Sequence, residues 1–202
     1  KMSARRKKQK TRFPLVFLGL FLIGIAFIFS LNSLADPLPK EEETNTEAIS
    51  HEEFIDRIAP YAQELQKGYG ILPSIIIGQA ILESDWGQSS LASEYNNLFG
   101  IKSFGHSKKV TLDTQEFYNG EWVTIQGDFR VYDTWEESMD DHTMLFVNGV
   151  DWNPALYVDV LTANDYRSAA QALQDAGYAT DPDYASKIIQ VIETYQLNRF
   201  DQ

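Results

Sequence analysis

The chain has 202 residues, of which 44% are apolar and 23% charged, a balance typical of one globular domain with an appendage. It contains no cysteine, which excludes a disulfide scaffold and thiolate metal sites. Seven of the 17 basic residues lie within positions 1–12, so the rest of the chain has 10 basic residues against 29 acidic ones, an excess that argues against nucleic acid as a partner.

The first predicted element is a transmembrane signal anchor over residues 13–34. Residues 15–31 read LVFLGLFLIGIAFIFSL without a charge, which is close to the roughly 20 apolar residues that span a bilayer. The basic segment 1–12 precedes this run, so the positive-inside tendency places it in the cytoplasm and the remainder outside the cell. The run is longer than the ~7–15-residue core of a signal peptide. Small residues at Ser33 and Ala35 nevertheless leave cleavage open, and cleavage after Ala35 would release the domain.

A linker is predicted at 35–49. It contains the run DPLPKEEETNT, with two prolines and three consecutive glutamates. Such a segment cannot bury enough apolar surface to order itself, so we expect a disordered spacer between the membrane and a domain at 50–202.

The domain is expected to open with a helix. Ser50 and Glu53 have the spacing of a capping box, and apolar residues follow at helical spacing. We expect Pro60 to kink this helix, and Gly68 and Gly70 to end it.

A second helix is predicted from Pro73 to about Asp85, closed by Gly87. Proline suits the first turn of a helix because its missing N–H would have no partner there. The sequence SIIIGQAILES is so apolar that this helix should lie at the centre of the fold.

Residues 110–132 are predicted to form a small β-lobe. Asn119-Gly120 is a strong signal for a two-residue hairpin turn. Such a turn would pair Tyr118 with Glu121, Phe117 with Trp122, and Glu116 with Val123.

Helices are expected again after the hairpin. Thr134 and Glu137 form a second capping box before a helix that runs to about residue 148, and a shorter helix at 165–176 is closed by a glycine. Asp181 and Pro182 are expected to cap and begin the last helix. The predicted fold class is therefore α+β, mainly helical, with one small β-hairpin lobe.

Glu83 is the first candidate catalytic residue. It ends the most apolar helix, where the negative end of the helix dipole and the apolar surroundings both raise the pKa of a carboxyl group. Such a group could hold a proton near neutral pH and donate it. A solvated glutamate at a helix end is the alternative.

Glu116 is the second candidate. Strand alternation places it on the hairpin face that also carries Thr114, Val123 and Ile125. A carboxylate on a partly apolar face indicates a cleft between the β-lobe and the helices. The alternative is a charge that keeps an edge strand from pairing with other chains.

Glycosidases typically use two carboxyl groups of this kind for catalysis. One protonates the leaving oxygen, and the other stabilises the positive charge or activates water. Two glutamates alone are weak evidence, because many helices and strands carry them.

Five blocks of sequence carry a family resemblance: ILPSIIIGQAILESDWGQS, NNLFGIK, TQEFYNGEW, FRVYDTWEESMDDH and GYATDPDYASKI. They closely resemble the glucosaminidase domain of glycoside hydrolase family 73, which comprises bacterial peptidoglycan hydrolases with a lysozyme-like fold. The resemblance covers about Glu52 to Leu197. It implies an endo-beta-N-acetylglucosaminidase that hydrolyses the beta-1,4 bond between N-acetylglucosamine and N-acetylmuramic acid.

The resemblance also assigns residues. The family's general acid falls on Glu83, its second carboxylate on Glu116, and a tyrosine near its cleft on Tyr178. The chain departs from the family at Asp85, where glycine is usual, and at Gly78, which replaces a more usual alanine.

Candidates for substrate binding are Trp86, Asn97, Phe99 and Tyr178. Aromatic rings stack on sugar faces, and an amide can hydrogen-bond an acetamido group. The alternatives are core packing for the aromatic residues and a structural turn for Asn97. The same alternatives apply to three further rings, those of Tyr132, Trp135 and Tyr184.

No metal or cofactor is predicted. Asp140, Asp141 and His142 are consecutive, and consecutive helix residues point about 100° apart, so the three cannot easily converge on one ion. The expected partners are peptidoglycan glycan strands and, through the N-terminal helix, the membrane, for a protein that acts as a monomer. A muramidase, a lytic transglycosylase and a catalytically silent wall-binding protein remain alternatives.

Overall fold

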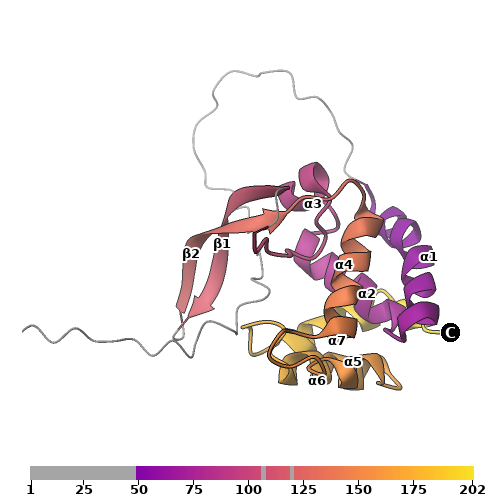
Figure 1. The fold of residues 1–202 in the computed structure, drawn as a ribbon. Helices are drawn as coiled ribbons and strands as arrows, with labels where there is room; N and C mark the ends of the chain where they lie inside the picture. Colours follow the sequence, from indigo (N-terminus) through magenta and orange to yellow (C-terminus); the bar gives the residue numbers. More distant parts are fainter. Residues whose placement is uncertain (1–48, 106–107, 119–120) are drawn as a thin grey trace, which may run out of the picture.

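The computed structural model describes residues 49–105, 108–118 and 121–202, and gives only the backbone at 115–118 and 122. These residues form a mainly helical domain with one two-stranded antiparallel sheet, as predicted (Figure 1). The predicted anchor at 13–34 and nearly all of the predicted linker lie outside the described residues. Within the described part of the chain, no helix has the length and hydropathy needed to cross a bilayer.

Helix α1 (His51–Tyr69) begins as the sequence predicts. The Ser50 hydroxyl accepts the backbone N–H of Glu53, and the Glu53 carboxylate accepts the backbone N–H of Ser50, so the capping box is confirmed. Gly70 ends the helix in the left-handed conformation, with φ of 87°. Gly68 lies inside the helix, so its predicted role in ending the helix is wrong. Pro60 also lies inside the helix, and the kink expected there stays a prediction.

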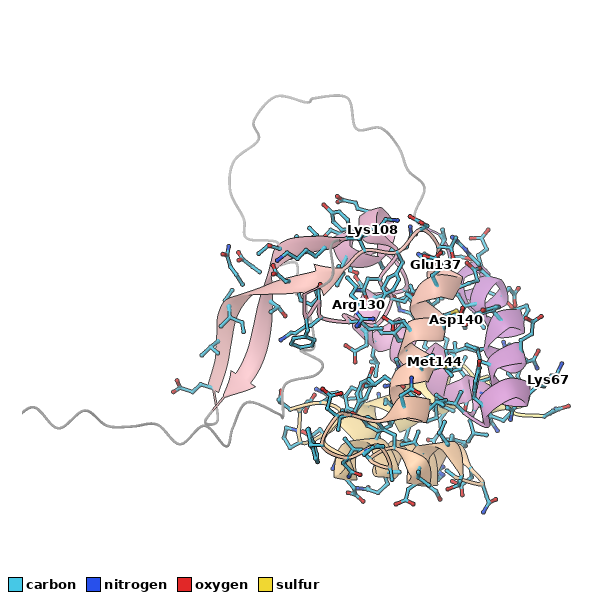
Figure 2. The ribbon with its side chains drawn as sticks, viewed as in Figure 1. Lys67, Lys108, Arg130, Glu137, Asp140 and Met144 are labelled. Carbon is cyan, nitrogen blue, oxygen red and sulfur yellow. The ribbon has the colours of Figure 1, made fainter. Side chains whose placement is uncertain are left out.

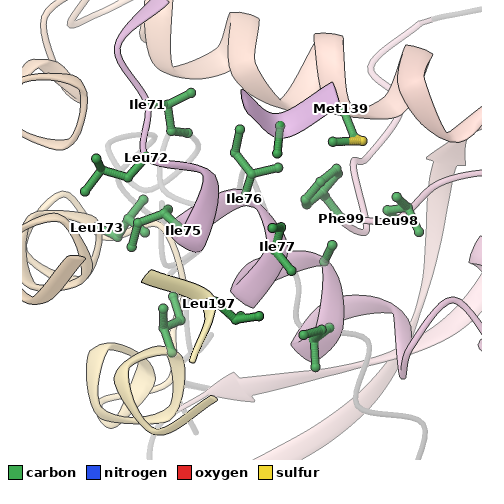
Figure 3. Packing of buried hydrophobic residues seen from close by; sticks show 14 of the residues in the cluster. Ile71, Leu72, Ile75, Ile76, Ile77, Leu98, Phe99, Met139, Leu173 and Leu197 are labelled. Carbon is green, nitrogen blue, oxygen red and sulfur yellow. The ribbon is translucent and has the colours of Figure 1, made fainter. Parts of the chain in front are cut away.

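Helix α2 (Pro73–Ser84) is the central element of the core, as its apolar sequence predicts. Nearly all of its residues are buried. Figure 3 shows its isoleucines in the middle of the packed cluster, with Leu173 of α6 on one side and Phe99 and Met139 on the other. The prediction that Gly87 closes the helix is wrong. Asp85 is the cap and has a left-handed φ of 50°, because the chain turns away two residues earlier than a Gly87 cap requires.

Strands β1 (Lys109–Tyr118) and β2 (Glu121–Arg130) form the hairpin, which extends away from the helices in Figure 1. The three predicted strand pairs are confirmed, including Glu116 opposite Val123. The Asn119-Gly120 turn itself lies outside the described residues.

Several further helices follow. They are α3 (Ser90–Tyr95), α4 (Trp135–Asn148), α5 (Val158–Leu161), α6 (Tyr166–Asp175), α7 (Tyr184–Thr194) and a 3₁₀ helix, η2 (Leu197–Phe200). Of these, α6, α7 and η2 pack against α2. The short elements α3, α5 and η2 were not expected, because four to six residues give too little periodicity to recognise.

One predicted capping box and one predicted helix start need correction. The Thr134 side chain caps α4, but the Glu137 carboxylate accepts the N–H of Asp133, one residue before the expected partner. The last helix, α7, begins at Tyr184 and not at Pro182. The Asp181 carboxylate instead accepts the N–H of Asp183, so it holds the turn that precedes the helix.

Gly78 offers a test of core packing. A Cβ at this position of α2 would lie 3.3 Å from Cγ1 of Ile192, a side-chain atom that has to shift by a few tenths of an ångström. Alanine in a helix interior is favoured over glycine by about 1 kcal/mol. We therefore expect Gly78→Ala to raise the free energy of unfolding by about 0.5–1 kcal/mol in urea denaturation.

Gly68→Ala is the matched control, because it lies in α1 with no atom within 4 Å of the new methyl group. It should also stabilise the domain through helix propensity alone. If Gly78→Ala proves destabilising while Gly68→Ala stabilises, Ile192 is too tightly packed to yield.

Candidate active site

Glu83 is a buried carboxyl group at the C-terminal end of α2. Only 3% of the residue is exposed, although glutamate is almost never fully buried without a partner. Its Oε1 atom accepts a 2.7 Å hydrogen bond from the hydroxyl of Tyr184, the first residue of α7. Its Oε2 atom is enclosed and makes no hydrogen bond with any described residue. The alternative of a solvated glutamate at a helix end is therefore wrong.

A second buried side chain supports this hydrogen bond. Gln79 lies one helical turn before Glu83, so the two side chains share a face of α2. The Gln79 amide donates to the Tyr184 hydroxyl over 3.0 Å. Tyr184 thus connects two successive turns of α2 to the start of α7.

These surroundings favour the protonated form of Glu83. Burial raises its pKa from the usual 4.5 to about 8, because a charge is poorly solvated in the interior, and the nearby Asp181 carboxylate adds to the rise. The hydrogen bond from Tyr184 acts in the opposite direction, since it stabilises the carboxylate. Burial is the larger effect, so Glu83 carries a proton at neutral pH.

The turn after α2 contains two residues in an unusual backbone conformation. Asp85 and Trp86 have φ of 50° and 60°, in the left-handed region that favours glycine. The Trp86 ring is held in place by stacking on His51, with centroids 3.6 Å apart, and by an edge contact with Tyr195. Only 9% of Trp86 is exposed, so its expected role as a sugar platform stays a prediction.

The other predicted binding residues also lie in the interior. Phe99 is fully buried and stacks on His142, and Tyr178 is buried and stacks on Tyr184. The Asn97 amide donates to the carbonyl oxygens of Ile101 and Arg130. Phe99 and Asn97 therefore have structural roles. Tyr178 lies next to Tyr184, whose hydroxyl donates to Glu83. Binding of substrate by the three residues stays a prediction.

The position of Glu116 is known from the strand register alone, because its side chain lies outside the described residues. Residue 116 shares a hairpin face with Phe129, which is buried at the base of the hairpin, and with Thr114, which is buried in the middle of β1. On the same face of β2, Ile125 opposite Thr114 and Val123 opposite residue 116 are both exposed. Position 116 therefore lies on the face of the hairpin that, at its base, packs against the body.

A pocket of about 190 Å³ lies between the base of the hairpin and α4. Phe104, which is 63% exposed, and Met144 contribute to its lining. The side chain of Arg130, at the end of β2, lies beside α4 (Figure 2). Its guanidinium donates to Asp141, and the hydroxyl of Tyr132 donates to the same carboxylate. These bonds fix the base of the hairpin against the helical body.

The three consecutive residues considered as metal ligands have separate partners. Asp140 accepts from the Tyr61 hydroxyl, Asp141 accepts from Arg130, and His142 is buried between aromatic rings. Among the residues with described side chains, no group of three His, Asp or Glu side chains could hold a metal ion.

Comparison with known proteins identifies the family. The family model Glucosaminidase, described as mannosyl-glycoprotein endo-beta-N-acetylglucosaminidase, matches residues 59–197, a range that includes Glu83 and the whole hairpin. The chain belongs to the glucosaminidase family.

The names of curated relatives of this glucosaminidase give different activities. The chain is 45% identical over 199 residues to the exo-glucosaminidase LytG of Bacillus subtilis (strain 168), covering 98% of this chain and 70% of LytG. It is 36% identical over 209 residues to a probable N-acetylmuramidase of Lactococcus lactis subsp. cremoris, covering all of this chain but 48% of that protein.

Solved structures share the fold. The catalytic domain of the autolysin Auto from Listeria monocytogenes matches with a TM-score of 0.68 and 34% identity, covering 82% of this chain and all of that one. A glycoside hydrolase domain of FlgJ from Salmonella typhimurium matches with a TM-score of 0.57 and 33% identity, covering 73% and 98%.

Sequence reasoning missed the immediate partners of Glu83. The sequence predicts for Tyr184 only a sugar platform or a core ring, and for Asp181 only a helix cap. Gln79 was not singled out, although a polar residue four positions before Glu83 in so apolar a helix was an available signal. The link between Glu83 and Tyr184 spans 101 residues of sequence, and nothing in the local pattern reveals it.

Proposed function

We propose that this glucosaminidase is a peptidoglycan hydrolase that cleaves the beta-1,4 bond between N-acetylglucosamine and N-acetylmuramic acid. The observation that carries the proposal is the burial of the Glu83 carboxyl group at the end of the central helix, which raises its pKa to about 8. A glycosidase needs such a group to protonate the leaving oxygen at neutral pH. Family membership and the exo-glucosaminidase LytG support the sugar, and relatives named peptidoglycan hydrolase FlgJ support a cell-wall substrate. The helical body with one β-hairpin fits a lysozyme-like fold.

In the proposed reaction, Glu83 transfers its proton to the glycosidic oxygen as the bond to the anomeric carbon breaks. Glu116 then stabilises the positive charge or activates water. Its place on the face shared with Phe129 supports this role, because Phe129 is buried at the base of the hairpin, where that face turns toward the body. The 2-acetamido group of the sugar is an alternative nucleophile, so the reaction does not require Glu116 to attack the anomeric carbon.

Oε2 of Glu83 is the oxygen without a partner among described residues, and it is enclosed. The glycosidic oxygen therefore reaches it only after neighbouring side chains move apart. Catalytic geometry often tightens only in the complex with substrate, so an enclosed acid in the free enzyme is compatible with catalysis.

The products test the proposal. Purified cell walls are digested with the full chain, and the soluble fragments are reduced and analysed by mass spectrometry. Reducing N-acetylglucosamine ends are expected. The size of the fragments separates cleavage within strands, which we propose as endo action, from release of sugars at chain ends. Absence of any soluble fragment would contradict the proposal and favour a silent wall-binding protein.

A muramidase is the second candidate, because lactococcal relatives that match the whole chain are named probable N-acetylmuramidases. It would leave reducing N-acetylmuramic acid ends in the same experiment. A lytic transglycosylase would leave 1,6-anhydro ends, since it uses no water.

We also propose that residues 13–34 anchor the enzyme in the cell membrane with the catalytic domain outside. The uncharged run and the basic segment before it support this orientation. We propose that the anchored enzyme acts on glycan strands close to the membrane and that it does so as a monomer.

A further inference from the structure

The two oxygens of Glu83 differ in their surroundings. Oε1 accepts a hydrogen bond from Tyr184, whereas Oε2 has no partner among the described residues and is equally enclosed. A protonated carboxyl group has one oxygen that accepts and one that carries the hydrogen. The two oxygens are therefore not equivalent as proton donors.

The direction of the hydrogen bonds decides which oxygen accepts. Gln79 donates its amide N–H to the Tyr184 hydroxyl oxygen over 3.0 Å, so the hydroxyl is already an acceptor on that side. A tyrosine hydroxyl has one proton to give, and the oxygen of Glu83 is its 2.7 Å partner. Oε1 thus receives that proton as an acceptor, and the acidic hydrogen of Glu83 belongs on Oε2.

We propose that Tyr184, itself held by Gln79, is a positioning residue that fixes the Glu83 carboxyl group so that Oε2 delivers the catalytic proton. This inference rests on the proposed function, in which Glu83 is the general acid. Tyr184 is suited to the task because its ring is buried and stacked on Tyr178, which limits its movement.

Proton transfer from Glu83 accompanies cleavage of the glycosidic bond, and water restores the proton. The hydrogen on Oε2 passes to the glycosidic oxygen, which also takes the electron pair of its bond to the anomeric carbon. Water supplies the hydroxyl group that ends on the anomeric carbon, directly or after attack by the acetamido oxygen, and its other proton returns to Glu83. Tyr184 keeps its own proton throughout and continues to donate to Oε1.

The charged and titratable groups around Glu83 come from one stretch of the chain. Tyr178 and Tyr184 are both buried, and burial together with the Glu83 charge raises the pKa of each hydroxyl well above its usual value, so both stay neutral. Asp181 is nearly buried and pairs with Lys187, a residue of α7. Asp181 raises the pKa of Glu83, and the Tyr184 hydrogen bond lowers it.

Tyr184→Phe tests the inference, because it keeps the ring and removes the hydroxyl. A positioned general acid supplies about 10²–10⁴-fold in rate, and we expect the variant to lose roughly tenfold in kcat/KM on purified walls. Losing a donor to the carboxylate also raises the pKa of Glu83. The alkaline limb of the kcat/KM profile should therefore move to higher pH by about one pH unit, although the enzyme is slower.

Asp181→Asn should shift the pKa of Glu83 in the opposite direction. It keeps an oxygen for the N–H of Asp183 but removes the negative charge near Glu83 and leaves the charge of Lys187 in place. The pKa of Glu83 should fall, so the alkaline limb moves to lower pH. Tyr157→Phe is the matched control, because it removes the hydroxyl of another buried tyrosine of the same aromatic cluster without touching Glu83. Its profile should match that of the wild type.

A second readout keeps the test independent of activity. The Glu83 carboxyl carbon is titrated by NMR in the full chain and in Tyr184→Phe, and the pKa of Glu83 should be higher in the variant. If Tyr184→Phe does not fold, Gln79→Leu replaces it, and it should give a smaller shift in the same direction, since the hydroxyl loses its support.

An unchanged or lower pKa of Glu83 in Tyr184→Phe overturns the inference, because the hydroxyl then does not donate to the carboxylate. Unchanged kcat/KM overturns it as well, because the acid is then positioned without Tyr184. A wild-type enzyme that releases no fragments from cell walls overturns the proposed function instead, and the NMR titration still reports whether Tyr184 donates to Glu83.

Discussion

Replacement of Glu83 by glutamine is expected to abolish lysis of purified cell walls and, at the same time, to stabilise the domain at pH 8. The amide cannot donate a proton to the glycosidic oxygen, so the loss in kcat should reach about 10³-fold. Tyr184 still donates to the remaining carbonyl oxygen, so the buried hydrogen bond to α7 is retained.

The gain in stability follows from where the Glu83 proton is held. The folded protein keeps it up to about pH 8, whereas the unfolded chain releases it near 4.5. The wild type has the full contribution of this proton below about pH 4.5 and loses it as the pH rises through about 8. The loss is on the order of 4 kcal/mol. Glutamine is neutral at every pH and avoids it.

Urea denaturation of both proteins at pH 5 and pH 8 measures this difference. The stability advantage of Glu83→Gln should be larger at pH 8. Glu94→Gln is the control, because Glu94 is an exposed carboxylate on α3, and its removal should leave lysis intact. Wild-type lysis by Glu83→Gln would refute the assignment of the general acid, and an advantage that does not grow with pH would show that Glu83 is ionised in the folded protein.

The sequence predicts most of the fold because its strongest signals are local. The Ser50 capping box, the apolar second helix and the Asn-Gly turn each act over a few residues, and the helix starts and strand pairs that they imply are confirmed. The short helices escape prediction because their order depends on the core around them. The displaced start of α7 has a similar cause. Asp181 lies in a buried turn beside Glu83, and α7 begins only after this turn.

The sequence predicts the catalytic candidate Glu83 but not the residues that surround it, and the reason is physical. Glu83 is conspicuous because a carboxylate interrupts an apolar helix, and this anomaly survives without any knowledge of the fold. Its partners come from α7 and from the turn before it, far along the chain. Their types, tyrosine and aspartate, are common at helix starts and in cores, so only the tertiary structure distinguishes Tyr184 from the other tyrosines.

His142 should make the domain sensitive to acid. It is fully buried on α4 between the rings of Phe99 and Phe146, with Tyr178 beyond, and neither ring nitrogen has a hydrogen-bond partner among the described residues. No charged group contacts it in that part of the chain. Burial alone lowers its pKa from 6.5 to about 3, because the imidazolium cannot be solvated there.

The sign of the effect is opposite to that of Glu83. The unfolded chain takes up a proton at His142 below about pH 6.5, whereas the folded protein does so only near pH 3. The unfolding free energy is therefore intact above about 6.5 and falls as the pH drops toward 3, by an amount on the order of 3–5 kcal/mol.

His142→Met removes this contribution, because methionine is similar in size and does not titrate. The stability of the variant should fall less steeply than that of the wild type between pH 7 and pH 4 in urea denaturation. Leu173→Met, a volume-conserving change elsewhere in the core, should shift the stability by less than about 1.5 kcal/mol and leave its dependence on pH unchanged. Parallel curves for wild type and His142→Met would mean that the folded protein can protonate His142, which requires water or an anion to reach a ring that the packing of Phe99 and Phe146 now seals.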